Sequence, residues 1–318
     1  MLRQHREVDA IRAEVARVIV GQHALVDRLL VALLTNNHAL IEGVPGLAKT
    51  LTVSTLARAL ECSFSRIQFT PDLLPADVTG TLIFNPQDGA FRVRRGPVFA
   101  NIVLADEINR APAKVQSALL EAMQERTVSI GGDSLALPDP FLVLATQNPI
   151  EQEGTYPLPE AQLDRFMMKI VVDYPERAEE REILGRALDG EEVEPRAAVS
   201  IAEIASLRAA VREVSVNDRL REYVVRLVEA SRDPERYQMG DLAPLIEFGA
   251  SPRAAVFLAR GAQAYAFING RDHVTPEDIK TLAPDVLRHR LVMTYEAEAR
   301  GVTADEVVTR LLEGVGIP

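Results

Sequence analysis

One glycine-containing segment has the residue types and spacing of a phosphate-binding loop. Gly43-Val-Pro-Gly46-Leu-Ala-Lys49-Thr50 follows the apolar run 39–41 and opens a stretch with helical periodicity. The two glycines let the backbone turn and approach phosphate closely, Lys49 would neutralise the β- and γ-phosphates, and the Thr50 hydroxyl would face Mg²⁺. A helix N-terminus adds about half a positive charge. We therefore expect nucleotide contacts from Gly43, Val44, Pro45, Gly46, Leu47, Ala48, Lys49, Thr50 and Leu51.

Ala48 departs from the general form of such a loop, which has glycine directly before the lysine. A positive φ at Ala48 would cost roughly 1 kcal/mol or more. The alternative interpretation is a strand-to-helix turn that binds nothing. The following segment favours the loop, because apolar residues recur there with helical spacing and predict a helix that packs on a core. These residues are Val53, Leu56, Ala57 and Leu60.

Two carboxylates follow a second apolar strand, as the chemistry of a bound triphosphate requires. The run 101–105 leads into Asp106 and Glu107. Ligands bind at the carboxyl edge of a parallel sheet, so this position would bring both acids beside the loop. Asp106 would hold Mg²⁺ through its water shell, and Glu107 would polarise the attacking water. The alternative is a strand that ends in a solvated acidic turn.

A third apolar strand, 141–146, ends in an amide side chain. Asn148 would reach the same sheet edge and orient water against the γ-phosphate. Alone, this residue is equally typical of a simple turn before Pro149. Its value lies in the order along the chain, in which a loop, an acidic pair and an asparagine each follow a strand.

The pattern of elements predicts two domains. Residues 1–175 alternate helices with short apolar strands, which is typical of a parallel sheet covered on both faces. Residues 176–318 have a helical pattern and predict an all-α lid, with helix starts at Asn217, Thr275 and Thr303. Two segments, 81–93 and 127–137, have turn residues between apolar runs and predict β-hairpins. The alternative interpretation is that both are ordinary surface hairpins without a special function.

Composition restricts the class of protein. The chain of 318 residues is 47% hydrophobic, has no run of 18 apolar residues and begins with a charged segment, so we expect a cytoplasmic protein without a membrane span. The net charge is −11 and no basic tract occurs, which disfavours nucleic acid as a partner. Arg92, Arg94 and Arg95, in the first predicted hairpin, are the nearest approach to a basic cluster.

The segments GVPGLAKT, VLADEINRAP, ATQNP and LPEAQLDRF together resemble the MoxR branch of the AAA+ ATPases, over nearly the whole chain. The resemblance implies an ATPase with ATP and Mg²⁺, in which Asp106 and Glu107 form the Walker B pair and Asn148 is sensor 1. It also implies that Arg165 is the arginine finger, that Arg253 is sensor 2, and that the turn with Val20 and Gly21 lies against the adenine. The two hairpins match the helix-2 insert and the pre-sensor-1 hairpin of the clade that contains MoxR and the magnesium chelatase ATPase subunit.

Arg165 is a poor candidate to reach its own γ-phosphate, because it follows the strand that carries Asn148. A neighbouring subunit could present it, so we expect a homo-oligomeric ring, most simply a hexamer, with shared active sites. By resemblance, the ring would remodel or mature a protein complex, often with a von Willebrand factor A domain partner. The alternatives are a chelatase-type subunit for metal insertion and a DNA-dependent, helicase-like motor.

Overall fold

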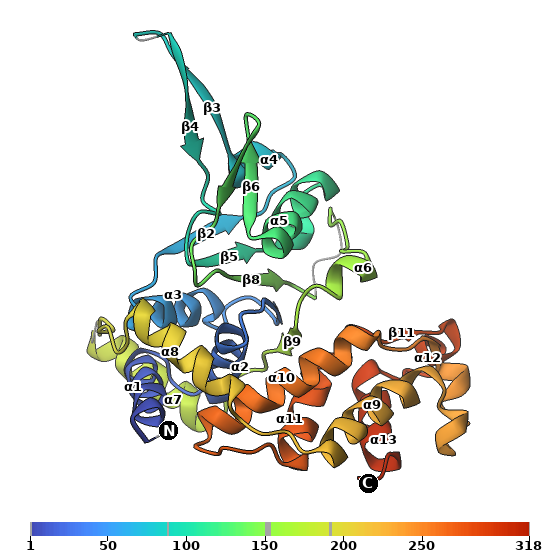
Figure 1. Ribbon diagram of the computed structural model, residues 1–318. Helices are drawn as coiled ribbons and strands as arrows, with labels where there is room; N and C mark the ends of the chain where they lie inside the picture. The colour runs from blue at the N-terminus through green and yellow to red at the C-terminus, as the bar shows by residue number, and fades with distance from the viewer. Residues whose placement is uncertain (1, 88, 150–153, 191–192, 318) are drawn as a thin grey trace.

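The computed structural model describes residues 2–87, 89–149, 154–190 and 193–317 (Figure 1). An α/β part carries two hairpins that project from it, and a helical part lies at the opposite end. Among the described residues, no helix is long and apolar enough to cross a membrane. The predicted boundary after residue 175 falls between the last strand of the sheet and the next helix.

A five-stranded parallel sheet forms the centre of the α/β part, with strand order β2-β5-β8-β1-β9. Its strands are β1 (Ala39–Glu42), β2 (Phe64–Gln68), β5 (Ile102–Asp106), β8 (Leu142–Gln147) and β9 (Met168–Val171). This order confirms the predicted parallel sheet. It also places β8 directly between β5 and β1, so the ends of the three strands that carry the predicted site residues are neighbours.

Helices cover both faces of this sheet, and alternate residues of each central strand enter two different cores. Ile41 and Leu104 belong to the larger core, whereas Leu40 and Val103 belong to the smaller one. The covering helices of the larger core include α1 (Leu2–Val18), α2 (His23–Leu34) and α3 (Lys49–Ala59), while α5 (Ala113–Glu125) covers the other face. Burial on both faces is why the strands read as continuous apolar runs in the sequence.

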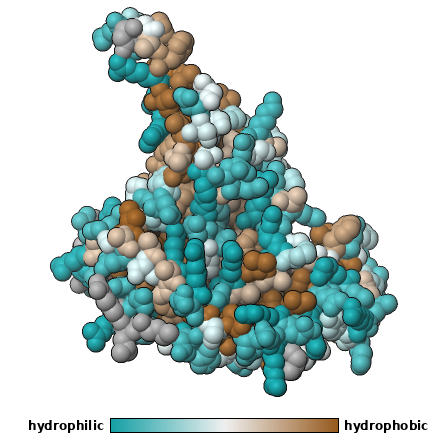
Figure 2. Space-filling view, viewed as in Figure 1, coloured by the Kyte–Doolittle hydropathy of each residue, from teal (hydrophilic) through white to brown (hydrophobic). Residues whose placement is uncertain are grey.

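Both predicted hairpins are present. The first consists of β3 (Gly80–Asn85) and β4 (Ala90–Arg95), and the second of β6 (Thr127–Ile130) and β7 (Asp133–Ala136). Asp88 of the predicted Asp-Gly turn lies outside the described residues, while Gly89 has a φ of +69°. The first hairpin projects far from the body of the protein (Figures 1 and 2). Short helical segments lie between the strands: α4 (Pro75–Thr79), η1 (Ile108–Arg110) and α6 (Glu160–Leu163).

The remaining chain is helical, as predicted, and its helices begin at the expected caps. Asn217 Oδ1 accepts a hydrogen bond of 2.9 Å from Leu220 N, and Thr275 and Thr303 belong to capping boxes. The helices are α7 (Arg177–Asp189), α8 (Ile201–Arg212), α9 (Asp218–Arg232), η2 (Glu235–Tyr237), η3 (Ala243–Leu245), α10 (Pro252–Ile268), α11 (Pro276–Leu287), α12 (Tyr295–Ala299) and α13 (Ala304–Gly314). A short antiparallel pair, β10 (Ile246–Phe248) with β11 (Val292–Met293), was not predicted from the helical pattern.

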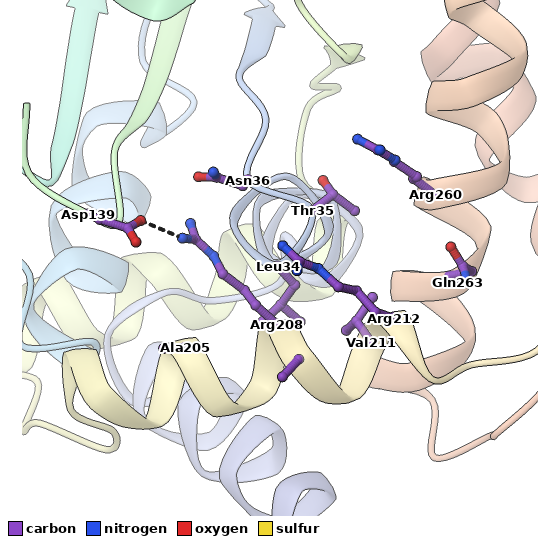
Figure 3. A pocket seen from close by; sticks show the side chains of 11 residues that line it. Leu34, Thr35, Asn36, Asp139, Ala205, Arg208, Val211, Arg212, Arg260 and Gln263 are labelled. Carbon is purple, nitrogen blue, oxygen red and sulfur yellow. Dashed lines mark hydrogen bonds and ion pairs between the residues drawn. The ribbon is translucent and has the colours of Figure 1, made fainter. Parts of the chain in front are cut away.

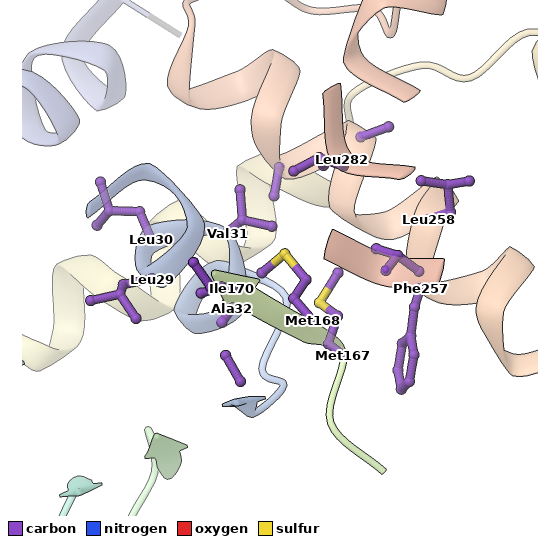
Figure 4. Close-up of a cluster of buried hydrophobic side chains, with 14 of the residues drawn as sticks. Leu29, Leu30, Val31, Ala32, Met167, Met168, Ile170, Phe257, Leu258 and Leu282 are labelled. Carbon is purple, nitrogen blue, oxygen red and sulfur yellow. The ribbon is translucent and has the colours of Figure 1, made fainter. Parts of the chain in front are cut away.

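The helical part shares a hydrophobic core with the α/β part. Side chains of α2, of the segment 167–170 and of α10 and α11 pack together in one cluster (Figure 4). Arg288 Nη1 also donates a hydrogen bond of 2.6 Å to Lys169 O of β9. The architecture therefore changes from α/β to helical at residues 175 and 176, but one large hydrophobic core spans both parts.

Candidate nucleotide site

The predicted phosphate loop connects the end of β1 to the start of α3. Gly43 is buried, and a Cβ there would come 2.8 Å from Val172 O, so only glycine fits against the chain beyond β9. Gly46 has a φ of +88°, a left-handed backbone that favours glycine. The loop thus leads straight into a helix N-terminus, whose free N–H groups are a ready site for phosphate.

Ala48 has a φ of +53° and stands directly before α3. The positive φ anticipated for this position therefore occurs, in a residue with a Cβ. An alanine there carries a conformational cost of about 1 kcal/mol relative to a right-handed backbone.

Lys49 lies in the middle of the site. Its Nζ donates a hydrogen bond to Gly43 O across the loop. Burial lowers the pKa of Lys49, and the negative charges of Asp106, Glu107 and Glu42 oppose that lowering. The lysine is thus near both predicted Walker B acids, and a phosphate group would give it a stronger partner than a carbonyl oxygen.

Asp106 is held on both sides at the end of β5. Arg66 Nη2 of β2 lies 2.6 Å from Asp106 Oδ2, and Thr146 Oγ1 of β8 donates a 2.6 Å hydrogen bond to Asp106 Oδ1. Thr146 also accepts a 2.9 Å hydrogen bond from the backbone N–H of Glu107. A single threonine therefore fixes the relative position of the two acids.

Glu107 is oriented toward β2. Gln68 Nε2 donates a 2.9 Å hydrogen bond to Glu107 Oε2, and Arg110 Nε lies 3.0 Å from the same oxygen. Glu107 itself has a φ of +57°, so the chain turns sharply after β5. In this conformation Glu107 Oε2 is bound on the β2 side of β5, away from β1.

Asn148 lies one residue beyond the end of β8 and is buried. Gly43 N donates a 3.4 Å hydrogen bond to Gln147 O, so the start of the phosphate loop contacts the residue before Asn148. The structure thus places Asn148 between the strand of the loop and the strand of the two acids.

An apolar pocket of about 220 Å³ lies beside the phosphate loop. Val20 lines it together with residues of the loop and of α7, whereas Gly21 does not. A Cβ at Gly21 would come 2.3 Å from Glu179 Oε1, so this glycine allows α7 to approach. The full lining is Val18, Ile19, Val20, Gln22, Gly46, Leu47, Ala48, Leu51, Pro175, Ile183 and Arg186. Its volume and mostly apolar lining suit a nucleobase.

Arg165 and Arg253 lie together on a different pocket. Both line a hollow of about 240 Å³, none of whose lining residues belongs to the phosphate loop or to the Walker B pair. Asp164 joins the two parts of the chain there, because it accepts a 3.2 Å hydrogen bond from Arg253 Nη1 and one of 2.7 Å from Arg290 Nε. Burial lowers the pKa of Arg290 to about 10, against the opposing charge of Asp164.

The donor set at the sheet edge fits Mg²⁺ in a nucleotide complex. The Thr50 hydroxyl makes no hydrogen bond to another described residue, and Asp106 supplies carboxylate oxygens, the hard donors that Mg²⁺ prefers. Within the described part of the chain, no three His, Cys, Asp or Glu side chains gather into a metal site. In nucleotide complexes Mg²⁺ is held by one or two protein oxygens together with phosphates and water, which agrees with this donor set.

Comparison with known proteins decides the family. Residues 38–168 match the model of the ATPase family associated with various cellular activities (AAA), and residues 241–311 match an AAA lid domain. Chaperone MoxR1 of Mycobacterium tuberculosis is 52% identical over 305 residues, covering 96% of this chain and 81% of that protein. Protein MoxR of Methylorubrum extorquens is 33% identical, covering 100% and 97%. The chain is a member of the MoxR family of AAA+ ATPases.

A solved structure agrees with this assignment over the full length. A crystal structure of an ATPase candidate from Cytophaga hutchinsonii has a TM-score of 0.94 and 49% identity, and the match covers 100% of this chain and 96% of that one. The MoxR fold described above, with its lid and two hairpins, is thus shared with a close relative.

The structure adds residues to the MoxR site that the sequence patterns did not single out. Arg66 and Gln68 belong to β2, and Thr146 lies inside β8. The rule that strand ends meet at one edge would have pointed to Gln68, because it is the last residue of a parallel strand. Thr146 is hidden within an apolar run, and only its hydrogen bonds reveal it.

Proposed function

We propose that this MoxR protein is a Mg²⁺-dependent ATP hydrolase that works as a chaperone in the cytoplasm and remodels or matures a protein complex. The observation that carries the proposal is the meeting of the phosphate loop, the Walker B pair and Asn148 at one edge of the sheet. Electrostatics support it, since Lys49 interacts with both Asp106 and Glu107.

Each residue at this edge has a distinct role in the proposal. The N-terminus of α3 and Lys49 bind the phosphates, while Thr50 and Asp106 hold the metal ion, which neutralises charge as it develops on the phosphates. Glu107 accepts a proton from the attacking water, and Asn148 orients that water. Val20 and the adjacent apolar pocket receive the base.

The position of Arg165 and Arg253 supports the proposal that active sites are shared between subunits. Arg165 and Arg253 line a pocket of their own. A neighbouring molecule that presents this face would bring both arginines to the phosphates of the next subunit, where a cation stabilises the charge of the transition state. We therefore propose a homo-oligomeric ring, with six subunits as the expected number.

The projecting hairpin is the proposed contact with a protein client. Phe84 is 52% exposed and Phe91 is 67% exposed, and their rings contact each other at 5.3 Å between centroids. Figure 2 shows hydrophobic surface along this hairpin. Exposed apolar groups in such a position are typical of an interaction site, and Arg94 adds positive charge for an acidic surface. A von Willebrand factor A domain protein is the client class that we propose.

One pair of variants tests the chemical part of this proposal. Lys49→Ala should lose tight ATP binding, because it removes the charge that neutralises phosphate in the ground state. Glu107→Gln should bind ATP normally and lose turnover, because it removes only the base. Fluorescent-nucleotide titration beside phosphate release separates the two. Full turnover in Glu107→Gln would remove Glu107 from the mechanism.

The same Glu107→Gln variant tests the biological part. Held in the ATP-bound state, it should retain its client during affinity purification, with Lys49→Ala as the control that does not. Mass spectrometry then identifies the retained protein. DNA-stimulated hydrolysis would instead support the helicase-like alternative, and retention of a tetrapyrrole enzyme would support the chelatase-type one.

A further inference from the structure

A second polar pocket lies away from the nucleotide site, between α8, α10 and the end of α2 (Figure 3). Its volume is about 360 Å³, within the range of roughly 300 to 1,000 Å³ that is typical of small-molecule sites. Its lining shares no residue with the apolar pocket beside the loop or with the pocket of Arg165 and Arg253. The lining residues are Leu34, Thr35, Asn36, Asp139, Ala205, Arg208, Ala209, Val211, Arg212, Arg260 and Gln263.

Three arginines line this pocket against a single carboxylate. Arg208 and Arg212 come from consecutive turns of α8, and Arg260 reaches in from α10 (Figure 3). The carboxylate is Asp139, whose Oδ1 lies 2.8 Å from Arg208 Nη1. The pocket therefore has an excess of positive charge in a protein whose net charge is −11.

Arg208 is buried, with only 9% of its surface exposed. Its Nε donates a 2.9 Å hydrogen bond to Leu33 O, which caps the end of α2. This contact and the Asp139 pair leave Nη2 buried without a hydrogen-bond partner. Burial lowers the pKa of Arg208, and the charge and hydrogen bond of Asp139 oppose that lowering. A third interaction, with an anion, would stabilise this side chain.

Arg212 and Arg260 do not take part in the polar contacts that hold the described part of the fold together. Neither makes a hydrogen bond or an ion pair with another residue that the structure describes, and both are exposed. Asn36, also exposed, adds an amide at the same mouth. These two arginines add uncompensated positive charge beside the buried Arg208, and that combination favours a ligand that supplies negative charge.

We propose that this pocket binds a small anion of the diphosphate type, at a site separate from the phosphate loop. The planar forks of Arg208, Arg212 and Arg260 match phosphate oxygens in a way that chloride cannot use. The volume of about 360 Å³ leaves room for two linked phosphate groups. The diphosphate can come from free pyrophosphate or from a nucleoside diphosphate.

Binding to the Lys49→Ala protein tests this proposal, because that variant disables the phosphate loop. At constant ionic strength, calorimetric titration with sodium pyrophosphate should show saturable binding of one anion per chain. The double variant Arg212→Gln/Arg260→Gln, made in the same background, should bind at least tenfold more weakly. The matched control Arg219→Gln/Arg221→Gln removes two exposed arginines of α9 and should bind as before.

Two further experiments identify the source of the anion and provide a second variant in case the first one misfolds. Titration with ADP and AMP shows whether a nucleoside diphosphate binds through the same arginines, since AMP lacks the diphosphate. If the double Gln variant proves unstable, Arg212→Lys/Arg260→Lys keeps the charge and should still weaken binding, because lysine lacks the fork. Equal pyrophosphate affinity in the arginine variants and the control would overturn the proposal. Loss of ring assembly without any change in pyrophosphate affinity would overturn it too, and would assign the pocket to a subunit contact.

Discussion

Gln68 Nε2 donates a hydrogen bond of 2.9 Å to Glu107 Oε2, which ties the proposed catalytic base to the neighbouring strand. Gln68 stands opposite Asp106 in the register of β2 and β5. Its Oε1 accepts a 2.9 Å hydrogen bond from Arg66, which also pairs with Asp106. Asp106 and Glu107 thus share one polar network, and β2 lies on the far side of β5 from β8 and β1.

This network predicts that Gln68 restrains hydrolysis when the base is not required. Gln68→Leu removes the donor at similar size, so Glu107 is freer to turn toward the loop, and basal phosphate release should rise several-fold. The double variant Gln68→Leu/Glu107→Gln should remain inactive, which would show that the gain acts through Glu107. A fall in phosphate release in the single variant would mean that Gln68 positions Glu107 for the reaction instead.

Arg165 is predicted to act on the nucleotide of the next subunit. Its Nη1 contacts Leu120 O at 3.1 Å in its own chain. Arg165→Ala should bind ATP nearly normally and hydrolyse it at least a hundredfold more slowly, since arginine fingers contribute about 10³ to 10⁵ in rate. Mixing Arg165→Ala with Lys49→Ala subunits should restore activity, because an intact loop then meets an intact finger. Failure to recover activity in mixed rings of verified composition would argue against action between subunits.

The hairpin of β3 and β4 is predicted to serve the client and to contribute little to nucleotide chemistry. Replacing residues 85–90 by a two-residue turn, or Arg92, Arg94 and Arg95 by Ser, should leave basal ATPase within a few-fold and abolish client capture. Arg95 also lies over the Phe99 ring at 5.1 Å, so the single change Arg95→Ser controls for a local effect on that packing. A large loss of basal hydrolysis would instead indicate that the hairpin belongs to the active-site architecture of the ring.

Ala48 offers a test of stored backbone strain. Ala48→Gly should raise the free energy of unfolding by about 1 kcal/mol, because glycine adopts a positive φ without the Cβ penalty. Urea denaturation with an unchanged m-value would measure it. Ala205→Gly, at an exposed position in the interior of α8, should have the opposite sign. A destabilised Ala48→Gly protein would show that the loop relaxes its φ in solution.

Buried His38 predicts a loss of stability in acid. Its Nδ1 accepts a 2.9 Å hydrogen bond from Val143 N, and burial lowers its pKa to about 3. The unfolded chain takes up this proton near pH 6.5 but the folded chain does not, so stability is full above that pH. It should fall by about 1.4 kcal/mol per pH unit as the pH drops toward the folded pKa.

Urea denaturation at neutral pH and at mildly acidic pH checks this dependence on His38. His38→Gln should unfold with a shallower pH dependence than the parent protein, whereas His23→Gln, an exposed control, should keep the original slope. The pKa of buried His289 is also well below its ordinary value, so part of the dependence should remain. Identical slopes in all three proteins would show that His38 gains its proton in the folded state.

The sequence by itself determined the parallel sheet, the helical lid, both hairpins and the family. These depend on local signals: apolar runs of strand length, capping residues such as Asn217 and Thr303, turn glycines, and motifs whose order is fixed along the chain. The meeting of the ends of β1, β5 and β8, which carry the proposed site residues, was predictable because parallel strands bring their carboxyl ends to one edge.

Only the tertiary structure decided how these residues are paired. Gln68 and Thr146 engage Glu107 because strand order makes β2 and β8 the two neighbours of β5, and that order is set by long-range pairing. The separation of Arg165 and Arg253 from the loop depends on how the lid packs against α2 and β9. Likewise, Arg212 and Arg260 are 48 residues apart in sequence, and no local pattern predicts that two helices will turn them toward one pocket.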